Sequence, residues 1–217
     1  MKKKSFIFAL FLIFSSLQVK ANNDFQQWSL STLEGNFNEK FGYYLELQHR
    51  QKDHWSDPSL TIIRPALKFN LNKNASIYQG YDWFASYDDF KVEHRLWQQL
   101  LLKKQFNKLK AMTWLRLEER FLPDLDFGLR FRIRSGFRYP ILNSKKWSFD
   151  FFDELFINLY DVEGGPQGGF DQNWIFSGLN YQFNQNAGLQ IGYILNILDR
   201  AEIELQHGLR ATLHFHF

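Results

Sequence analysis

The sequence predicts an all-β protein: an antiparallel, up-and-down transmembrane β-barrel of about ten to twelve strands behind a cleaved signal peptide. Three observations lead to this prediction. The chain begins with an export signal, its later segments alternate apolar and polar residues, and it ends in one such segment. Its mean hydropathy is negative although aromatic residues make up 18% of it. This combination is typical of barrels whose strands present one face to lipid and the other to a polar interior.

Residues 1–21 have the three parts of a secretory signal peptide. Three lysines follow the first methionine, an apolar run extends from residue 6 to residue 14, and Val19 and Ala21 supply the small residues of a cleavage site. The apolar run is too short to cross a bilayer as a helix. We therefore expect cleavage after Ala21 and a single barrel domain over residues 22–217, located in the bacterial outer membrane.

The mature chain is close to neutral. The whole sequence has 26 Lys and Arg against 23 Asp and Glu, and the loss of the four lysines within residues 1–21 leaves 22 basic residues against 23 acidic ones. A neutral chain gives no reason to expect a nucleic-acid partner. Because the sequence has no cysteine, it excludes a disulfide scaffold and a thiolate metal site. No motif indicates a cofactor or a metal.

The alternation of side chains along extended strands predicts which residues face inward. It is clearest over residues 128–141, where Leu129, Phe131 and Ile133 share one face and four arginines share the other. An arginine facing lipid at the bilayer midplane would cost roughly 2–4 kcal/mol, so we place the arginines and the charges of the same phase inside the lumen. The predicted lumen-lining residues are Glu93, Arg95, Arg116, Glu118, Arg120, Arg130, Arg132, Arg134, Arg138, Asp150 and Glu154.

A short repeat predicts where the strands turn. An apolar residue followed by Asn and polar residues occurs at five places, which begin at Phe37, Leu71, Phe106, Leu142 and Phe183. Asn suits tight turns because it tolerates a left-handed backbone and hydrogen-bonds within its own turn. Longer polar links, such as residues 51–59 and 161–169, alternate with these turns. Short turns at one end and long loops at the other are typical of outer-membrane barrels.

The predicted segments add up to an odd number of strands. Five Asn turns join ten strands, and the C-terminal segment adds an eleventh, whereas bacterial single-chain barrels have even numbers of strands. Two interpretations are open. Either residues 25–33 are not a full barrel strand, which leaves ten, or one strand is unrecognised, which gives twelve.

The last nine residues alternate strictly between apolar and polar side chains. We expect the apolar ones to face lipid and the strand to close the barrel against the first strand. The segment also resembles the terminal signal by which the insertion machinery recognises outer-membrane barrels. The residues of this predicted signal are Leu209, Ala211, Leu213, Phe215 and Phe217. The alternative is the last core strand of a soluble sandwich.

Two interpretations of the inward arginines are open. In the first, they form a ladder of arginine–carboxylate pairs that braces a narrow barrel. In the second, the arginines of residues 128–138 outnumber their partners and line a pore that prefers small anionic solutes. Asp153 breaks the alternation between Phe151 and Leu155. A local bulge that turns it inward explains this, and a functional carboxylate beside Glu154 is the alternative.

The sequence predicts no catalytic residues. His49 and His54 flank a predicted loop that contains Ser56, but a catalytic triad is defined by geometry rather than by proximity in sequence. No nucleophile elbow is present. His214 and His216 alternate on the last strand, where we expect solvated side chains rather than a metal site.

Several segments carry a family resemblance. They are "WSLSTLEGNFNEKFGYYLELQHR" over residues 28–50, Gly80-Tyr81, "EHRLWQQ" from Glu93, "DELF" from Asp153, and Gly178 with Tyr181. Together they look like a family of predicted Gram-negative outer-membrane β-barrel proteins catalogued as a domain of unknown function. The most specific part is Glu93, Arg95 and Gln98 on one strand, with His94 where the family pattern has Asn. The resemblance covers essentially the whole mature chain. It implies the barrel fold and an outer-membrane location, with lipid around the barrel, and no activity.

The sequence therefore predicts a narrow channel or a structural barrel with an arginine-rich polar lumen. Two alternatives are open. One is an outer-membrane enzyme that modifies lipid or lipopolysaccharide, and the other is a barrel that binds a surface partner through its extracellular loops.

Overall fold

A computed structural model describes residues 20–88, 90–142 and 144–217. The predicted signal peptide, residues 1–21, lies almost wholly outside these described residues. Within them, no helix is long and apolar enough to cross a membrane.

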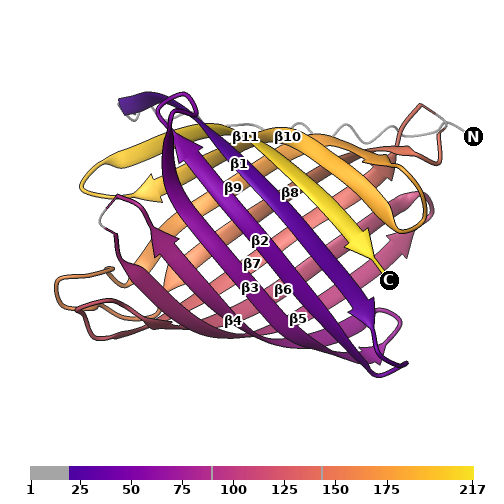
Figure 1. Cartoon of the computed structure of the whole chain (residues 1–217), viewed down its shortest axis with the longest axis horizontal. Coiled ribbons are helices and arrows are strands. Elements are labelled where there is room, and N and C mark those ends of the chain that lie inside the picture. Colours follow the sequence, from indigo (N-terminus) through magenta and orange to yellow (C-terminus); the bar gives the residue numbers. More distant parts are fainter. Residues whose placement is uncertain (1–19, 89, 143) are drawn as a thin grey trace, which may run out of the picture.

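The described chain folds into eleven strands that close one barrel, in which each strand lies beside its neighbours in sequence (Figure 1). The strands are β1 (Lys20–Asn36), β2 (Phe41–Lys52), β3 (Asp57–Asn72), β4 (Ala75–Ser86), β5 (Val92–Phe106), β6 (Leu109–Phe121), β7 (Phe127–Pro140), β8 (Trp147–Asn158), β9 (Gly169–Gln182), β10 (Ala187–Asp199) and β11 (Ile203–His216).

The barrel closes through a parallel contact between β1 and β11, whereas all other neighbouring strands are antiparallel. Along this contact Gln27 pairs with Leu209 and Leu33 with Phe215. The strand number falls within the predicted range, but the expected even number was wrong, because residues 25–33 belong to a full strand. With an odd number of up-and-down strands the first and the last run in the same direction, and a parallel ladder can join them.

All five predicted Asn turns lie at one end of the barrel, which we call the turn end; the opposite end is the loop end. Asn143 of the fourth turn lies outside the described residues, and the other four Asn residues stabilise their turns as expected. The side-chain oxygen of Asn38 accepts hydrogen bonds from the backbone N–H groups of Lys40 and Phe41, at 2.9 Å each. Asn107 has a φ of 54°, in the left-handed region. Most of the predicted long loops are shorter than expected because the strands continue into them, and the ten-residue link 159–168 is the exception.

The predicted alternation sorts side chains into an inner and an outer face. On β8, every second residue from Ser148 to Asn158 is buried, and the residues between them are partly exposed. Outward apolar side chains are open to the surroundings, and Leu67 for example is 66% exposed. On β11, Arg210 and Thr212 are buried inside the barrel. The last strand closes the barrel as predicted, because the backbone N–H of Phe217 donates to the carbonyl of Glu34 at the end of β1, at 2.9 Å.

The bulge predicted at Asp153 is wrong. Asp153 keeps the regular alternation of β8 and lies on the outer face, where it accepts a hydrogen bond from Asn173 Nδ2 at 3.2 Å. The irregularity is on the neighbouring strand instead. The register between β8 and β9 shifts between Phe156 and Ile157, so one extra residue of β9, Asp171, is buried alongside the inward face. The outward carboxylate of Asp153 is accommodated by a polar neighbour rather than by a change of backbone.

Apolar side chains also fill part of the interior, in two clusters. One contains Trp28, Leu30, Phe152, Phe156, Trp174, Phe176 and Ile194. The other contains Ala66, Tyr78, Trp97, Leu101 and Trp114. The second cluster depends on Gly80, because a Cβ atom at that position would lie 2.1 Å from the indole ring of Trp97. The interior therefore holds both aromatic rings and charged groups, and the rings limit the space in which guanidinium groups can lie.

Candidate functional site

The candidate site is the charged interior of the barrel. All eleven predicted lumen-lining residues lie on four consecutive strands, β5 to β8, and their side chains are in the interior. Nine are buried, whereas Arg134 and Arg138 are partly exposed. Their charged groups are brought together in ion pairs that run from the loop end to the turn end.

A central layer of ion pairs lies around Glu118 and Glu154, whose side chains are completely buried. Glu118 accepts from Nη2 of Arg130 at 2.6 Å and also from Arg132. Glu154 accepts from Arg132 and from Nε of Arg134 at 2.7 Å. Arg132 therefore bridges two carboxylates, which is the forked, bidentate use that the planar guanidinium favours.

The opposite wall contributes a second part of this layer, which the sequence analysis did not predict. Arg64 of β3 donates to Glu46 at 2.6 Å and, through two nitrogens, to both oxygens of Asp82 at 2.7 Å. The indole N–H of Trp97 also donates to Asp82, at 2.7 Å. The alternation of β2 and β3 places Glu46 and Arg64 on the polar face, so the sequence could have identified both as lumen-lining residues. The sequence could not show which residues they pair with.

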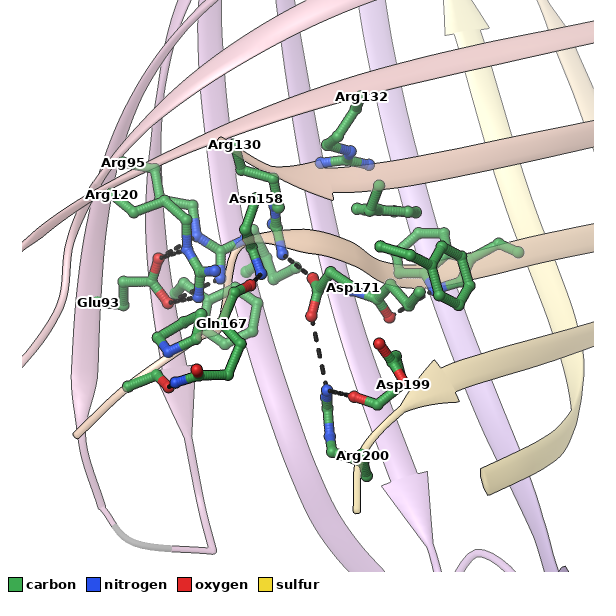
Figure 2. A pocket seen from close by; sticks show the side chains of 18 of the residues that line it. Glu93, Arg95, Arg120, Arg130, Arg132, Asn158, Gln167, Asp171, Asp199 and Arg200 are labelled. Carbon is green, nitrogen blue, oxygen red and sulfur yellow. Dashed lines mark hydrogen bonds and ion pairs between the residues drawn. The ribbon is translucent and has the colours of Figure 1, made fainter. Parts of the chain in front are cut away.

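Near the loop end, Glu93 lies between two arginines, as Figure 2 shows. Arg95 Nε donates to it at 2.6 Å and Arg120 Nε at 2.7 Å. Asp171, which the β9 bulge brings inward, pairs with Arg130 at 3.0 Å and with Arg200 at 3.5 Å. The sequence analysis missed Asp171, because the sequence does not show where a bulge inserts an extra residue into a strand.

Near the turn end, ion pairs lie closer to the rim. Arg138 donates to Asp150 at 2.6 Å, and Gln190 Nε2 donates to the same carboxylate at 2.6 Å. Lys68 pairs with Glu34 at 2.6 Å. Each of the four arginines on β7 thus has a carboxylate partner.

Some arginines are held by rings and amides instead of carboxylates. Arg50 lies 3.6 Å from the ring centre of Trp28 and 4.8 Å from that of Trp174. With its amide oxygen turned toward Arg50, Gln48 accepts from Nε at 2.6 Å. Arg210 donates to Gln190 at 2.7 Å. Aromatic faces and amide oxygens stabilise a desolvated cation without adding a negative charge.

Two of the cavities inside the barrel are large. The loop-end cavity has a volume of about 690 Å³, and its lining includes seven arginines and three carboxylates. The turn-end cavity has a volume of about 650 Å³, and its lining includes nine lysines and arginines and three carboxylates. Arg64 and Arg132 line both cavities. The central ion-pair layer therefore lies between them.

The link between β8 and β9 folds over the loop-end cavity. Residues 165–167 of this link line the cavity. The link is held by backbone hydrogen bonds, including Val162 N–H to the Pro166 carbonyl at 2.9 Å, and Val162 is buried. Asn158 Nδ2 donates to the Gln167 carbonyl at 2.9 Å. This link is thus part of the cavity wall.

His49 and Ser56, which the sequence analysis weighed for catalysis, have separate hydrogen-bond partners. His49 lies on the outer face and hydrogen-bonds to Thr61 Oγ1 at 3.0 Å, whereas Ser56 Oγ donates to the Asp53 carbonyl at 2.8 Å. The rings of His214 and His216 are 5.7 Å apart. Among the described residues, no group of three or more His, Cys, Asp or Glu side chains could hold a metal ion.

Comparisons with known proteins give a family for the chain. Residues 25–206 match the family described as "Protein of unknown function (DUF2490)". An uncharacterized protein of Methylorubrum extorquens is 31% identical over 201 residues, which cover 88% of this chain and 86% of that protein. No solved structure matches the chain. The resemblance to a domain of unknown function is confirmed, and the chain belongs to the DUF2490 family.

Proposed function

We propose that this chain is a bacterial outer-membrane β-barrel that is closed at mid-height, so that it acts as a braced structural barrel rather than as a permanently open channel. Ten-residue alternation, an apolar outer face and the closed sheet support the membrane location, because a barrel satisfies every backbone hydrogen bond within itself. We include the outer-membrane lipid and the barrel-insertion machinery, which would read the C-terminal strand, in this proposal.

The observation that carries the closed state is the ion-pair layer between the two cavities. Arg132 bridges Glu118 and Glu154, and Arg64 bridges Glu46 and Asp82. A pore that selects anions needs arginines that face the ion, but each arginine on β7 already has a carboxylate partner. This favours the brace over the anion-preferring pore.

Planar-bilayer recording of the refolded mature chain tests the proposal. We expect no sustained conductance from the wild type, because the layer closes the lumen. Arg132→Ala removes a side chain that lines both cavities, and we expect it to give discrete openings with an anion-selective reversal potential, since the remaining lining is cationic.

Arg138→Ala is the matched control. Arg138 lines the turn-end cavity alone and lies outside the central layer, so this variant should stay silent. A wild type that conducts steadily would contradict the closed state. Separation of inner and outer membranes from a Gram-negative host tests the location, and recovery of the folded chain in the soluble fraction would overturn it.

A further inference from the structure

Arg50 is the arginine of the loop-end cavity that lacks a carboxylate partner. In the part of the chain that the structure describes, each of the other six arginines of this lining forms an ion pair, and Arg50 forms none. With its amide oxygen turned toward Arg50, Gln48 accepts from Nε at 2.6 Å and from Nη2 at 3.0 Å. Nη1 is left without a hydrogen-bond partner. A cation inside a protein is costly unless a counter-charge is supplied, and here no neighbouring side chain supplies one.

The guanidinium of Arg50 is accessible. Its side chain lines the cavity and is partly exposed, whereas Arg64, Arg95 and Arg132 of the same lining are buried. Among the described residues, the side-chain atoms that lack both a hydrogen-bond partner and accessible surface include no atom of Arg50. Nη1 of Arg50 therefore combines unused donors with accessible surface.

The guanidinium is also fixed in orientation. It lies 3.6 Å from the ring centre of Trp28 and 4.8 Å from that of Trp174. The two rings pack edge to face, with their centres 4.8 Å apart. Their indole N–H groups donate to Gln26 at 3.1 Å and to Gln172 at 3.0 Å. The rings are thus held in place, and they present the guanidinium in one position before any ligand arrives.

The lining of this cavity is positively charged. It contains seven arginines and three carboxylates. Carboxylates of the central layer offset Arg64 and Arg132. In contrast, Arg95 and Arg120 share the single carboxylate of Glu93. Together with the unpaired Arg50, this arrangement leaves an excess of fixed positive charge, which attracts anions.

The cavity reaches the surface at the loop end. The side chain of Arg200 is 51% exposed, and the exposed residues Gln167 and Ala201 also border the cavity. Figure 2 shows Asp171 between Arg200 and the deeper Arg130. The volume of about 690 Å³ lies within the range of small-molecule sites, roughly 300–1,000 Å³. The cavity is therefore a pocket that a small solute can enter from the loop end.

We propose that the loop-end cavity binds a doubly charged oxyanion of the phosphate type, with oxygens on the Nη1 side of Arg50. The planar donors of arginine match phosphate oxygens, and the excess charge of the lining favours a dianion over a monoanion. A soluble phosphate compound and a lipid headgroup share this chemistry. The inference goes beyond the proposed function, because binding depends neither on the membrane location nor on closure of the lumen.

The test uses the refolded mature chain in dodecyl maltoside micelles, which contain no phosphate, and isothermal titration with inorganic phosphate in mildly alkaline buffer. Acetate is the singly charged probe. We expect saturable one-to-one binding of phosphate, with acetate at least tenfold weaker. Because Trp28 and Trp174 flank Arg50, phosphate should also change the tryptophan fluorescence.

Two competitors distinguish the sources of the phosphate group. Displacement of inorganic phosphate by glycerol phosphate would assign the site to a soluble phosphate ester. Displacement by phosphatidic acid added to the micelles would assign it to a lipid headgroup, and displacement by neither would leave inorganic phosphate as the ligand. All three results support the proposal.

Arg50→Gln should weaken phosphate binding at least tenfold. Arg50→Lys keeps the charge but loses the planar donors, so we expect an intermediate loss, and it serves as the second variant if Arg50→Gln does not refold. Arg138→Gln is the matched control, because it removes one charge from the turn-end cavity alone, and we expect a change below threefold. No saturable binding of phosphate, equal binding of acetate, unchanged binding by Arg50→Gln, or an equal loss in Arg138→Gln would each overturn the proposal.

Discussion

The two large cavities of the barrel are similar in size and both are cationic, but their carboxylates are shared differently. Near the loop end, Glu93 accepts hydrogen bonds from two arginines, and Asp171 forms ion pairs with two. Near the turn end, Glu34 and Asp150 each form an ion pair with a single basic side chain. The difference indicates that the wall is braced more tightly near the loop end. Other arginines lie on tryptophan faces at both ends, Arg50 in the lining of the first cavity and Arg116 in that of the second.

The largest effect is expected from disrupting the central ion-pair layer that lies between the two cavities. Glu118→Gln leaves Arg130 and Arg132 without a shared buried carboxylate. Loss of one partner of a buried ion pair costs about 3–5 kcal/mol, and we expect that decrease in the free energy of unfolding. Urea unfolding from lipid vesicles, followed by tryptophan fluorescence, measures it. The exposed Glu39→Gln serves as control, and a loss below about 1 kcal/mol would show that the layer does not brace the barrel.

The contrast between the two ends can be sharpened by removing one carboxylate from each. Glu93→Gln affects two buried arginines, whereas Glu34→Gln affects Lys68 and the hydroxyl of Tyr78 on a more exposed side chain. We expect losses of about 3 kcal/mol for the first and about 1 kcal/mol for the second, because hydrogen bonds between charged groups are worth more when buried. The same urea unfolding measures both. Equal losses would contradict the different roles of the two ends.

The aromatic support of the turn-end charge can be tested through Gly80. A Cβ atom there would lie 2.1 Å from Trp97, so Gly80→Ala has to displace the ring on which Arg116 lies. Overpacking of a filled interior costs typically about 1–3 kcal/mol, and we expect the free energy of unfolding to fall by about 2 kcal/mol. Gly128→Ala, where an added Cβ atom would lie 3.4 Å from its nearest neighbour, is the control. Unchanged stability of Gly80→Ala would show that the Trp97 ring moves aside without cost.

The smallest effect is expected for Thr212→Val. The Thr212 hydroxyl is buried and has no partner, so replacing it by a methyl group removes a desolvation cost without loss of volume. We expect unfolding to become harder by up to about 1 kcal/mol. A clear loss of stability would mean that the hydroxyl is bonded in the folded barrel.

The alternation in the sequence predicted the architecture and the inward side of the charges on β5 to β8, apart from Asp153. Arg130, Arg132 and Arg134 follow a strict two-residue period, and a strand has no other way to place such a run. The Asn turns were equally readable, because an Asn side chain stabilises a turn through neighbouring backbone groups. These features depend on residues close in sequence.

Features that depend on contacts between residues distant in sequence could not be predicted from the sequence. The closure by a parallel pair joins residues almost two hundred positions apart, as in Gln27 with Leu209. The partners of Arg64 come from two different strands, and the bulge at Asp171 appears only in the register of β9 on β8. Asp153 shows the opposite error, since an apparent break in the pattern left the strand regular.

The parallel contact between β1 and β11 has a topological consequence. β1 starts at the loop end and β11 finishes at the turn end, so the two ends of the barrel's own chain lie at opposite rims (Figure 1). In a barrel with an even number of strands both ends would lie at the same rim, where a short linker could join them in a circular permutant. Here a linker would have to run the full length of the wall. Two labels, one at the start of β1 and one at the end of β11, would therefore lie on opposite sides of any lipid bilayer that the barrel crosses.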